Sequence, residues 1–289
     1  MSSPATLSLL VFAASLSASS AHTWVSVTGS DSTGTGTPAK PYATFQTAVN
    51  NTAVAGVVSV MGPGDYGSVG IVQSVTIDGT GGGNITFTGG EGIFVNPSAA
   101  ATIVLRNLTI KGIGEGTNAI NVSSNTSAPT AYVVNVVIDG CLMEGFNQAG
   151  VILGSQGLED VLIRNSTIVG GTVGVTTNQS SGLYPYDKVT IEHTSIQGST
   201  AQGVLTRNGS VDIRDSVITQ GLTGLYADTG ANLNVQSSII TGNSYGVCVY
   251  TGSTGVIGTT TTVADNTTNI RACGGSIQGA GGAGPSLKL

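Results

Sequence analysis

Three charged side chains, Arg207, Asp228 and Asp187, have the types and spacing that suit acid–base chemistry. Arg207 and Asp228 occupy equivalent positions in two successive copies of a repeated pattern, so in a stacked structure they stand side by side. An arginine there can act as a base or bind a carboxylate, and the aspartate can act as an acid or bind a cation. Asp187 would add a second carboxylate from a longer connection. The alternative interpretation is a charge pair between stacked repeats.

A second group of residues suits ligand binding. Alternation along the strands and the long connection from Gly174 to Val189 bring polar and aromatic side chains to one outward surface. The candidates for binding are Asn178, Tyr184, Tyr186, Lys188, Tyr226 and Tyr250. Aromatic rings beside polar groups suit the faces of sugars. The other interpretation is that the tyrosines and Pro185 only pack the long connection onto the coil beneath it.

Most patterns of catalytic and metal sites are missing. A glycosidase needs two carboxylates about 5–10 Å apart, and a calcium-dependent lyase needs several converging carboxylate oxygens. The outward surface expected here supplies one carboxylate. No Ser-His-Asp order, P-loop or dinucleotide fingerprint occurs, and His193 falls in a turn. We therefore expect no metal and no cofactor, with calcium only if the chain is a lyase.

A repeat with a shortest spacing of about 22 residues must position these side chains. Three consecutive copies read VTIEHTSIQGSTAQGVLTRNGS, VDIRDSVITQGLTGLYADTGAN and LNVQSSIITGNSYGVCVYTGST. Each holds three short strand signals, V-x-I, S-x-I and G-V-x-V, without a helical stretch. The copies start at Ile103, Val136, Val161, Val189, Val211, Leu233 and, more loosely, Val256. Three strands in each stacked coil predict an all-β parallel β-helix with three sheets.

The register of the copies predicts the core and one corner. Two inward columns are Ile110, Met143, Ile168, Ile196, Ile218 and Ile240, and Leu105, Ile138, Ile163, Ile191, Ile213 and Val235. The first turn position after V-x-I alternates in charge, as Arg106, Asp139, Arg164, Glu192, Arg214 and Gln236. Coils lie about 4.8 Å apart, so opposite charges on adjacent coils attract. The next position, which includes Asn107 and His193, is mostly small and polar and suits a tight bend.

Both ends of the chain differ from the repeat. Residues 1–21 have an apolar core followed by small residues, which predicts a signal peptide cleaved between Ala21 and His22. Residues 22–56 are expected to form an N-terminal cap with a short helix at PYATFQTAVNN, 57–272 the β-helix, and 273–289 a Gly-rich, loosely ordered tail.

The stretches WVSVTGSD, PYATFQTAV and VVSVMGPGDYG, followed by these coils, resemble right-handed parallel β-helix proteins of the pectin-lyase-like superfamily. The resemblance implies that G-V-x-V forms the first sheet, V-x-I the second and S-x-I the third. It also implies a ligand cleft along the first sheet, walled by the connection that follows it. That superfamily includes lyases, hydrolases, esterases, epimerases and non-catalytic surface proteins. The paired aspartates and Gly-His-Gly turn of its hydrolases are missing here.

Composition narrows the partners and the compartment. Charged residues make up 8% of the chain and the net charge is −6, which speaks against nucleic-acid binding. No later stretch is long and apolar enough to span a membrane, and we expect a secreted or cell-surface protein. Cys141 is expected to be a buried small hydrophobe, whereas Cys248 and Cys273 lie about one repeat apart, which leaves their pairing open.

These observations favour a secreted, non-catalytic module that contacts polysaccharide or cell-surface material. Two alternatives stay open. One is a polysaccharide lyase or related carbohydrate-active enzyme that uses the charged trio, and the other is a structural or adhesive stalk. The oligomeric state stays open as well.

Overall fold

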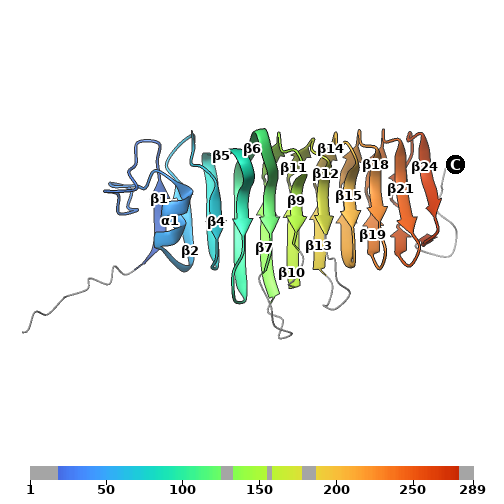
Figure 1. The fold of residues 1–289 in the computed structure, drawn as a ribbon, viewed down its shortest axis with the longest axis horizontal. Helices are drawn as coiled ribbons and strands as arrows, with labels where there is room; N and C mark the ends of the chain where they lie inside the picture. Colours follow the sequence, from blue (N-terminus) through green and yellow to red (C-terminus); the bar gives the residue numbers. More distant parts are fainter. Residues whose placement is uncertain (1–18, 125–132, 155–157, 178–186, 280–289) are drawn as a thin grey trace, which may run out of the picture.

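The computed structural model describes residues 19–124, 133–154, 158–177 and 187–279. Successive coils of the chain stack along one axis, from helix α1 at the N-terminal end to the last described coil at the other (Figure 1). Every pairing between named strands is parallel and joins one coil to the next, as in Val161 with Val189 and Val211 with Leu233. The chain is an all-β parallel β-helix, as the repeat predicts.

Three faces run along the solenoid. Face 1 contains β4 (Val69–Ile71), β9 (Ala149–Leu153), β12 (Val173–Thr177), β15 (Gln202–Thr206), β18 (Thr223–Ala227), β21 (Tyr245–Tyr250) and β24 (Thr268–Cys273). Face 2 contains β1 (Ser20–Val25), β2 (Thr52–Val60), β7 (Val133–Asp139), β10 (Leu158–Arg164), β13 (Asp187–Glu192), β16 (Gly209–Arg214), β19 (Asn232–Gln236), β22 (Thr254–Ile257) and β25 (Ser276–Gly279). Face 3 contains β3 (Gly64–Asp65), β8 (Leu142–Glu144), β11 (Thr167–Val169), β14 (Ser195–Gln197), β17 (Val217–Thr219), β20 (Ile239–Thr241) and β23 (Thr262–Val263). The long strands β5 (Val75–Val95) and β6 (Ala101–Val122) bend through all three faces.

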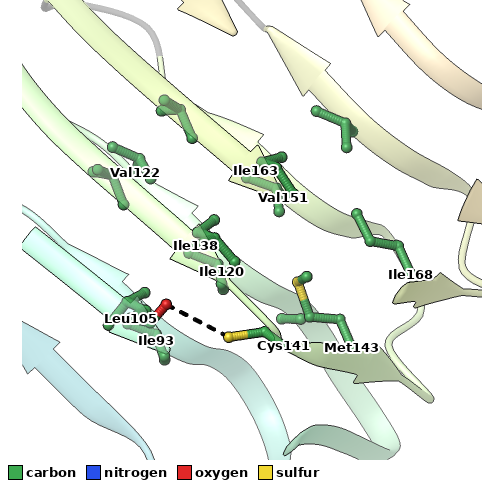
Figure 2. Close-up of a cluster of buried hydrophobic side chains, with 14 of the residues drawn as sticks. Ile93, Leu105, Ile120, Val122, Ile138, Cys141, Met143, Val151, Ile163 and Ile168 are labelled. Carbon is green, nitrogen blue, oxygen red and sulfur yellow. Dashed lines mark hydrogen bonds between the residues drawn. The ribbon is translucent and has the colours of Figure 1, made fainter. Parts of the chain in front are cut away.

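The core consists of stacked like residues. Both predicted inward columns are fully buried, with Ile110 stacked on Met143 and Leu105 on Ile138. Figure 2 shows this interior, where the thiol of Cys141 donates to the carbonyl oxygen of Leu105 at 3.6 Å. Burial raises the pKa of the Cys141 thiol to about 11, so this cysteine is the inert core residue that the sequence predicts.

The corner between faces 2 and 3 contains residues with a left-handed backbone conformation, next to a ladder of side chains whose charge alternates from coil to coil. Asn107, Asn165 and His193 all have positive φ, between 46° and 56°, which a small polar residue tolerates better than a branched one. Beside them Arg164 Nη2 lies 2.8 Å from Asp139 Oδ2. The hydrogen bond from Asn165, against the opposing effect of burial, and then the hydrogen bond and charge of Arg164 hold the pKa of Asp139 below its usual value. The predicted alternation is therefore confirmed, and His193 is a turn residue.

The N-terminal end is closed by α1 (Phe45–Asn51), whose Thr44 side chain accepts from the backbone N–H of Thr47. Asp31 accepts hydrogen bonds from the N–H of Ala43 at 2.8 Å and from the hydroxyl of Thr44 at 2.8 Å. The short predicted helix is confirmed. Strand β1 begins at Ser20, ahead of the expected cleavage point.

Two expectations about the C-terminal end are wrong. In the last coils Leu233 pairs with Gly255, so the last copy of the repeat starts at Gly255 and not at Val256 as expected. Strand β25 pairs with β22, so the β-helix extends past residue 272 into the segment predicted to be a loose tail. Pairing with the preceding coil forms this short strand within a segment whose glycines disfavour strands. Cys248 and Cys273 form a disulfide with a Cα–Cα distance of 5.8 Å.

Candidate functional site

The outer surface of face 1 carries an open groove of about 250 Å³. Its floor is a mostly apolar row of side chains from consecutive coils, interrupted by Thr176, and the polar residues Asn118, Gln148 and Thr172 also line the groove. The lining residues are Asn118, Gln148, Ala149, Ile152, Thr172, Val173, Thr176, Leu205 and Arg207. Ile152, Thr176 and Leu205 form a single row, because each is paired in register with the next. Their outward direction follows from alternation with the buried Val151, Val175 and Val204.

Arg207 and Asp228 meet at the opposite edge of this groove. Arg207 Nε lies 3.1 Å from Asp228 Oδ2, and the two side chains keep 46% and 29% of their exposure. The other carboxylate oxygen of Asp228 accepts from the backbone N–H of Thr229 at 2.8 Å. Both oxygens of this carboxylate thus have partners. The structure brings together the pair that the sequence placed on adjacent coils, as an ion pair.

The backbone of Arg207 is fixed from inside the solenoid. The buried hydroxyl of Thr177 accepts from the N–H of Arg207 at 2.8 Å and donates to its carbonyl oxygen at 3.1 Å. Because these bonds join adjacent coils, Arg207 leaves the sheet at a defined point. The backbone from which the Arg207 side chain extends is therefore fixed beside the groove.

Tyrosines lie beyond the ion pair, toward the C-terminal end of face 1. Tyr226 follows Leu205 in the same row, and burial, followed by the negative charge of Asp228, raises the pKa of its hydroxyl. Tyr250 is 45% exposed. The guanidinium of Arg271 lies 4.8 Å from the ring centre of Tyr245, a cation–π contact. The two predicted tyrosines therefore share a surface with Arg207 and Asp228.

Asp187 does not lie in the groove. It is the first residue of β13 and is fully buried, and its Oδ1 accepts from the N–H of Glu159 at 3.4 Å. Glu159, one coil earlier, is also buried, and its Oε1 accepts from the N–H of Ser124 at 2.9 Å. These carboxylates bind backbone groups inside the corner between faces 1 and 2. The expectation that Asp187 belongs to a loop beside the first sheet is wrong.

The remaining predicted residues divide into two sets. Lys188 is exposed on β13, in face 2 rather than in the long connection. Asn178, Tyr184 and Tyr186 lie outside the described residues.

Sequence reasoning missed one end of the groove. Asn118 and Asn121 both donate to Glu91 Oε1, at 3.5 and 3.1 Å, and Asn118 and Gln148 line the groove. Asn118 pairs with Glu91, so it belongs to an outward row three residues before the row of Asn121. Extending the outward rows back through each coil corner would have found them.

The described residues offer no evident place for a metal ion. Among them, no group of three or more His, Cys, Asp or Glu side chains lies together. A calcium ion needs several converging oxygens, whereas Asp228 is engaged by Arg207 and Thr229. Asp228 is therefore already engaged by protein groups and is not a free oxygen donor for a cation. In the same part of the chain, no helix has the length and apolar character needed to cross a bilayer.

Comparison with known proteins agrees with this geometry. Residues 91–268 match the family model described as "Right handed beta helix region". The crystal structure of pectate lyase Pel9A is similar, with a TM-score of 0.62 and 12% identity over 89% of this chain and 74% of that one. Tailspike protein 3 of bacteriophage CBA120 aligns at a TM-score of 0.28 and 14% identity, over 91% of this chain and 53% of that one. Curated proteins gave no match. The chain therefore belongs to the right-handed β-helix family and has the pectin-lyase-like fold.

Proposed function

We propose that this protein is a non-catalytic extracellular module that holds a polysaccharide or other cell-surface glycan in the groove of face 1. The observation that carries the proposal is the lining of the groove, in which an apolar floor is flanked by amides, hydroxyls and one arginine. Concave apolar sites with a few placed polar groups are the usual form of small-molecule sites. Sugar rings present both apolar faces and hydroxyl edges to such a surface.

The shape of the groove supports a chain-like ligand. Its floor runs across successive coils from Ile152 to Leu205, and outward side chains continue along the same row to Tyr226. A linear polymer can contact equivalent positions on several coils at once. The similar solved structure is named a pectate lyase, and pectate is a polysaccharide.

The arrangement of carboxylates supports binding without turnover. Asp228 is the carboxylate at the groove edge, and Arg207 already neutralises it. Asp187, which the enzyme hypothesis needs, is buried and accepts a backbone hydrogen bond. A general acid or base has to reach the proton that it transfers, and Asp187 does not face the groove.

Two features support an extracellular location. The disulfide between Cys248 and Cys273 is the kind of bond that persists in oxidising compartments. Residues 1–21 also have the composition of a secretory signal.

The competing proposal is a polysaccharide lyase, which the exposed Arg207–Asp228 pair beside the groove favours. We would incubate the purified chain with acidic and neutral polysaccharides, with and without calcium. Binding would be measured by affinity electrophoresis, and turnover by new reducing ends and by the ultraviolet absorbance of unsaturated products. We expect binding without products. Products that disappear in Arg207→Ala would refute the non-catalytic proposal.

A matched pair of variants tests whether the groove is the binding surface. Ile152→Ser removes an apolar side chain from the groove floor, and Ile239→Ser makes the same change at a residue of face 3 that is 46% exposed. We expect the first variant to lose at least about tenfold in affinity, or about 1.4 kcal/mol, and the second to bind as the wild type does. Equal binding by both variants would place the ligand elsewhere. If no polysaccharide binds at all, the structural stalk is left.

A further inference from the structure

We infer that the groove of face 1 selects uncharged glycans over polyuronates. This inference rests on the proposed function and adds the chemical class of the ligand to it. It is carried by the charges in and around the groove, which are few and leave no unpaired cation to meet a ligand carboxylate. The family fold alone would not separate the two classes.

Arg207 is the one charged side chain among the described residues that line the groove. Its guanidinium is bonded to Asp228 at 3.1 Å. A ligand carboxylate would have to compete with Asp228 for this guanidinium, and a displaced Asp228 would then repel it. Arg207 and Asp228 together add no net charge to the groove.

The N-terminal end of the groove adds a negative charge. Glu91 is bonded through Oε1 to the amides of Asn118 and Asn121, and amides bring no compensating positive charge. The surroundings of the groove formed by Glu91, Arg207 and Asp228 therefore have a net charge of −1. The whole chain is negative too, at −6.

The three internal segments outside the described residues add no charge to this balance. Residues 125–132, 155–157 and 178–186 follow strands of face 1, and their sequences contain no Asp, Glu, Lys or Arg. The next cation along face 1 is Arg271, which stacks on Tyr245. It stands three coils beyond Leu205 in the same row, roughly 14 Å away at about 4.8 Å a coil.

A polyuronate would place one carboxylate per sugar along an apolar floor. Each carboxylate would lose water without gaining a cation, and burying an unpaired charge is costly. An uncharged sugar avoids that cost. Its hydroxyls can pair with the amides of Asn118 and Gln148 and with the hydroxyls of Thr172 and Thr176, while its apolar face covers Ile152 and Leu205.

The experiment compares polymers that differ in charge and little else. Polygalacturonate and its fully methyl-esterified form share one backbone, and neutral glucan, mannan and xylan extend the panel. Affinity electrophoresis or calorimetry with the full chain would give each dissociation constant at low and at high NaCl. We expect at least one uncharged polymer to bind about tenfold or more tightly than polygalacturonate, with little dependence on salt, because charge interactions are what salt screens.

A matched pair of variants tests the role of charge. Glu91→Gln removes the carboxylate at the groove end, and Glu144→Gln makes the same change on face 3, where Glu144 pairs with Lys111 at 3.1 Å. We expect Glu91→Gln to narrow the preference for uncharged polymers and Glu144→Gln to leave it unchanged.

The outcomes separate this inference from the proposed function. If polygalacturonate binds as tightly as every uncharged polymer or more tightly, the selectivity is refuted and glycan binding by the groove stands. An unchanged preference in Glu91→Gln would also count against the charge argument. If no polymer binds, both the inference and the proposed function fail.

Discussion

A methyl group added at Gly203 should destabilise the solenoid, because the chain passes too close to the next coil there. Gly203 lies at the start of face 1, at the Gly-Val step of its repeat. A Cβ atom at this residue would lie 2.5 Å from Cγ2 of Ile218 and 2.7 Å from the carbonyl oxygen of Gly224. The first contact is to a fully buried side chain and the second is to backbone, so no rotamer change relieves both.

The size of the effect follows from two opposing contributions. Overpacking a well-packed interior costs about 1–3 kcal/mol, and a contact with backbone should lie in the upper part of that range. Replacing glycine by alanine also stabilises by about 0.4–1 kcal/mol through the unfolded chain. We expect Gly203→Ala to lower the free energy of unfolding by about 2 kcal/mol.

Gly89→Ala is the matched control, since nothing lies within 4 Å of a Cβ atom at Gly89. It carries the same unfolded-state contribution without the clash, so it should be neutral or slightly stabilising. The loss expected for Gly203→Ala relative to wild type corresponds to a fall in midpoint of about 4–8 °C, at about 2–4 °C per kcal/mol for a domain of this size. Thermal and urea unfolding followed by circular dichroism would measure it. Equal stability of the two variants would refute the close-packing argument.

Three further perturbations test other parts of the fold. Cys248→Ser removes the disulfide to Cys273, which closes a loop of 25 residues, and should lower the free energy of unfolding by about 3 kcal/mol. Unfolding with and without reductant measures this loss. A wild type whose stability does not change with reductant would contradict the prediction. Asp31 has a pKa below its usual value, because hydrogen bonds from Thr44 and the nearby backbone outweigh the opposing effect of burial. The stabilisation by the ionised Asp31 carboxylate is therefore present above the unfolded-state pKa and is lost as pH falls through the folded-state pKa. Asp31→Asn should be less stable than wild type at pH 7 and equally stable in acid. A stability difference that stays constant across the pH series would argue against this. Arg164→Glu places three carboxylates in succession along the corner ladder and should lower the free energy of unfolding by about 1 kcal/mol or less. High salt should restore this stability. A loss that does not depend on salt would mean that packing, not charge, is responsible.

The interior of this protein was predictable because the same packing contacts recur in every coil. Stacked coils put like residues on like residues, so a period in the sequence becomes a column such as Ile196 on Ile218. The alternating charges beside Asn165 were predictable for the same reason. The wrong assignment at Val256 came where Gly255 replaces the usual apolar residue and hides the period.

The candidate site was less predictable because it is formed where the repeat is interrupted. Asn118 and Gln148 stand near coil corners, where alternation along one strand no longer gives the direction of a side chain. Asp187 is different, since the signal was present. It lies two residues before the inward Val189, so period-two alternation places it inside. The long connection from Gly174 to Val189 hid this pattern, because Asp187 was expected to belong to that loop and not to a strand.

Buried polar side chains hold the backbone at the ends of the face-1 strands, close to the groove. Glu159 accepts from the N–H of Ser124, just after the last face-1 residue of β6. One coil further on, Asp187 accepts from the N–H of Glu159, and Thr177 holds the backbone of Arg207. A buried donor left without an acceptor costs about 1–3 kcal/mol, so these acceptors fix where the chain leaves face 1 beside the groove. Asp187, the carboxylate that sequence reasoning assigned to chemistry, thus acts inside the corner between faces 1 and 2, where it accepts the N–H of Glu159.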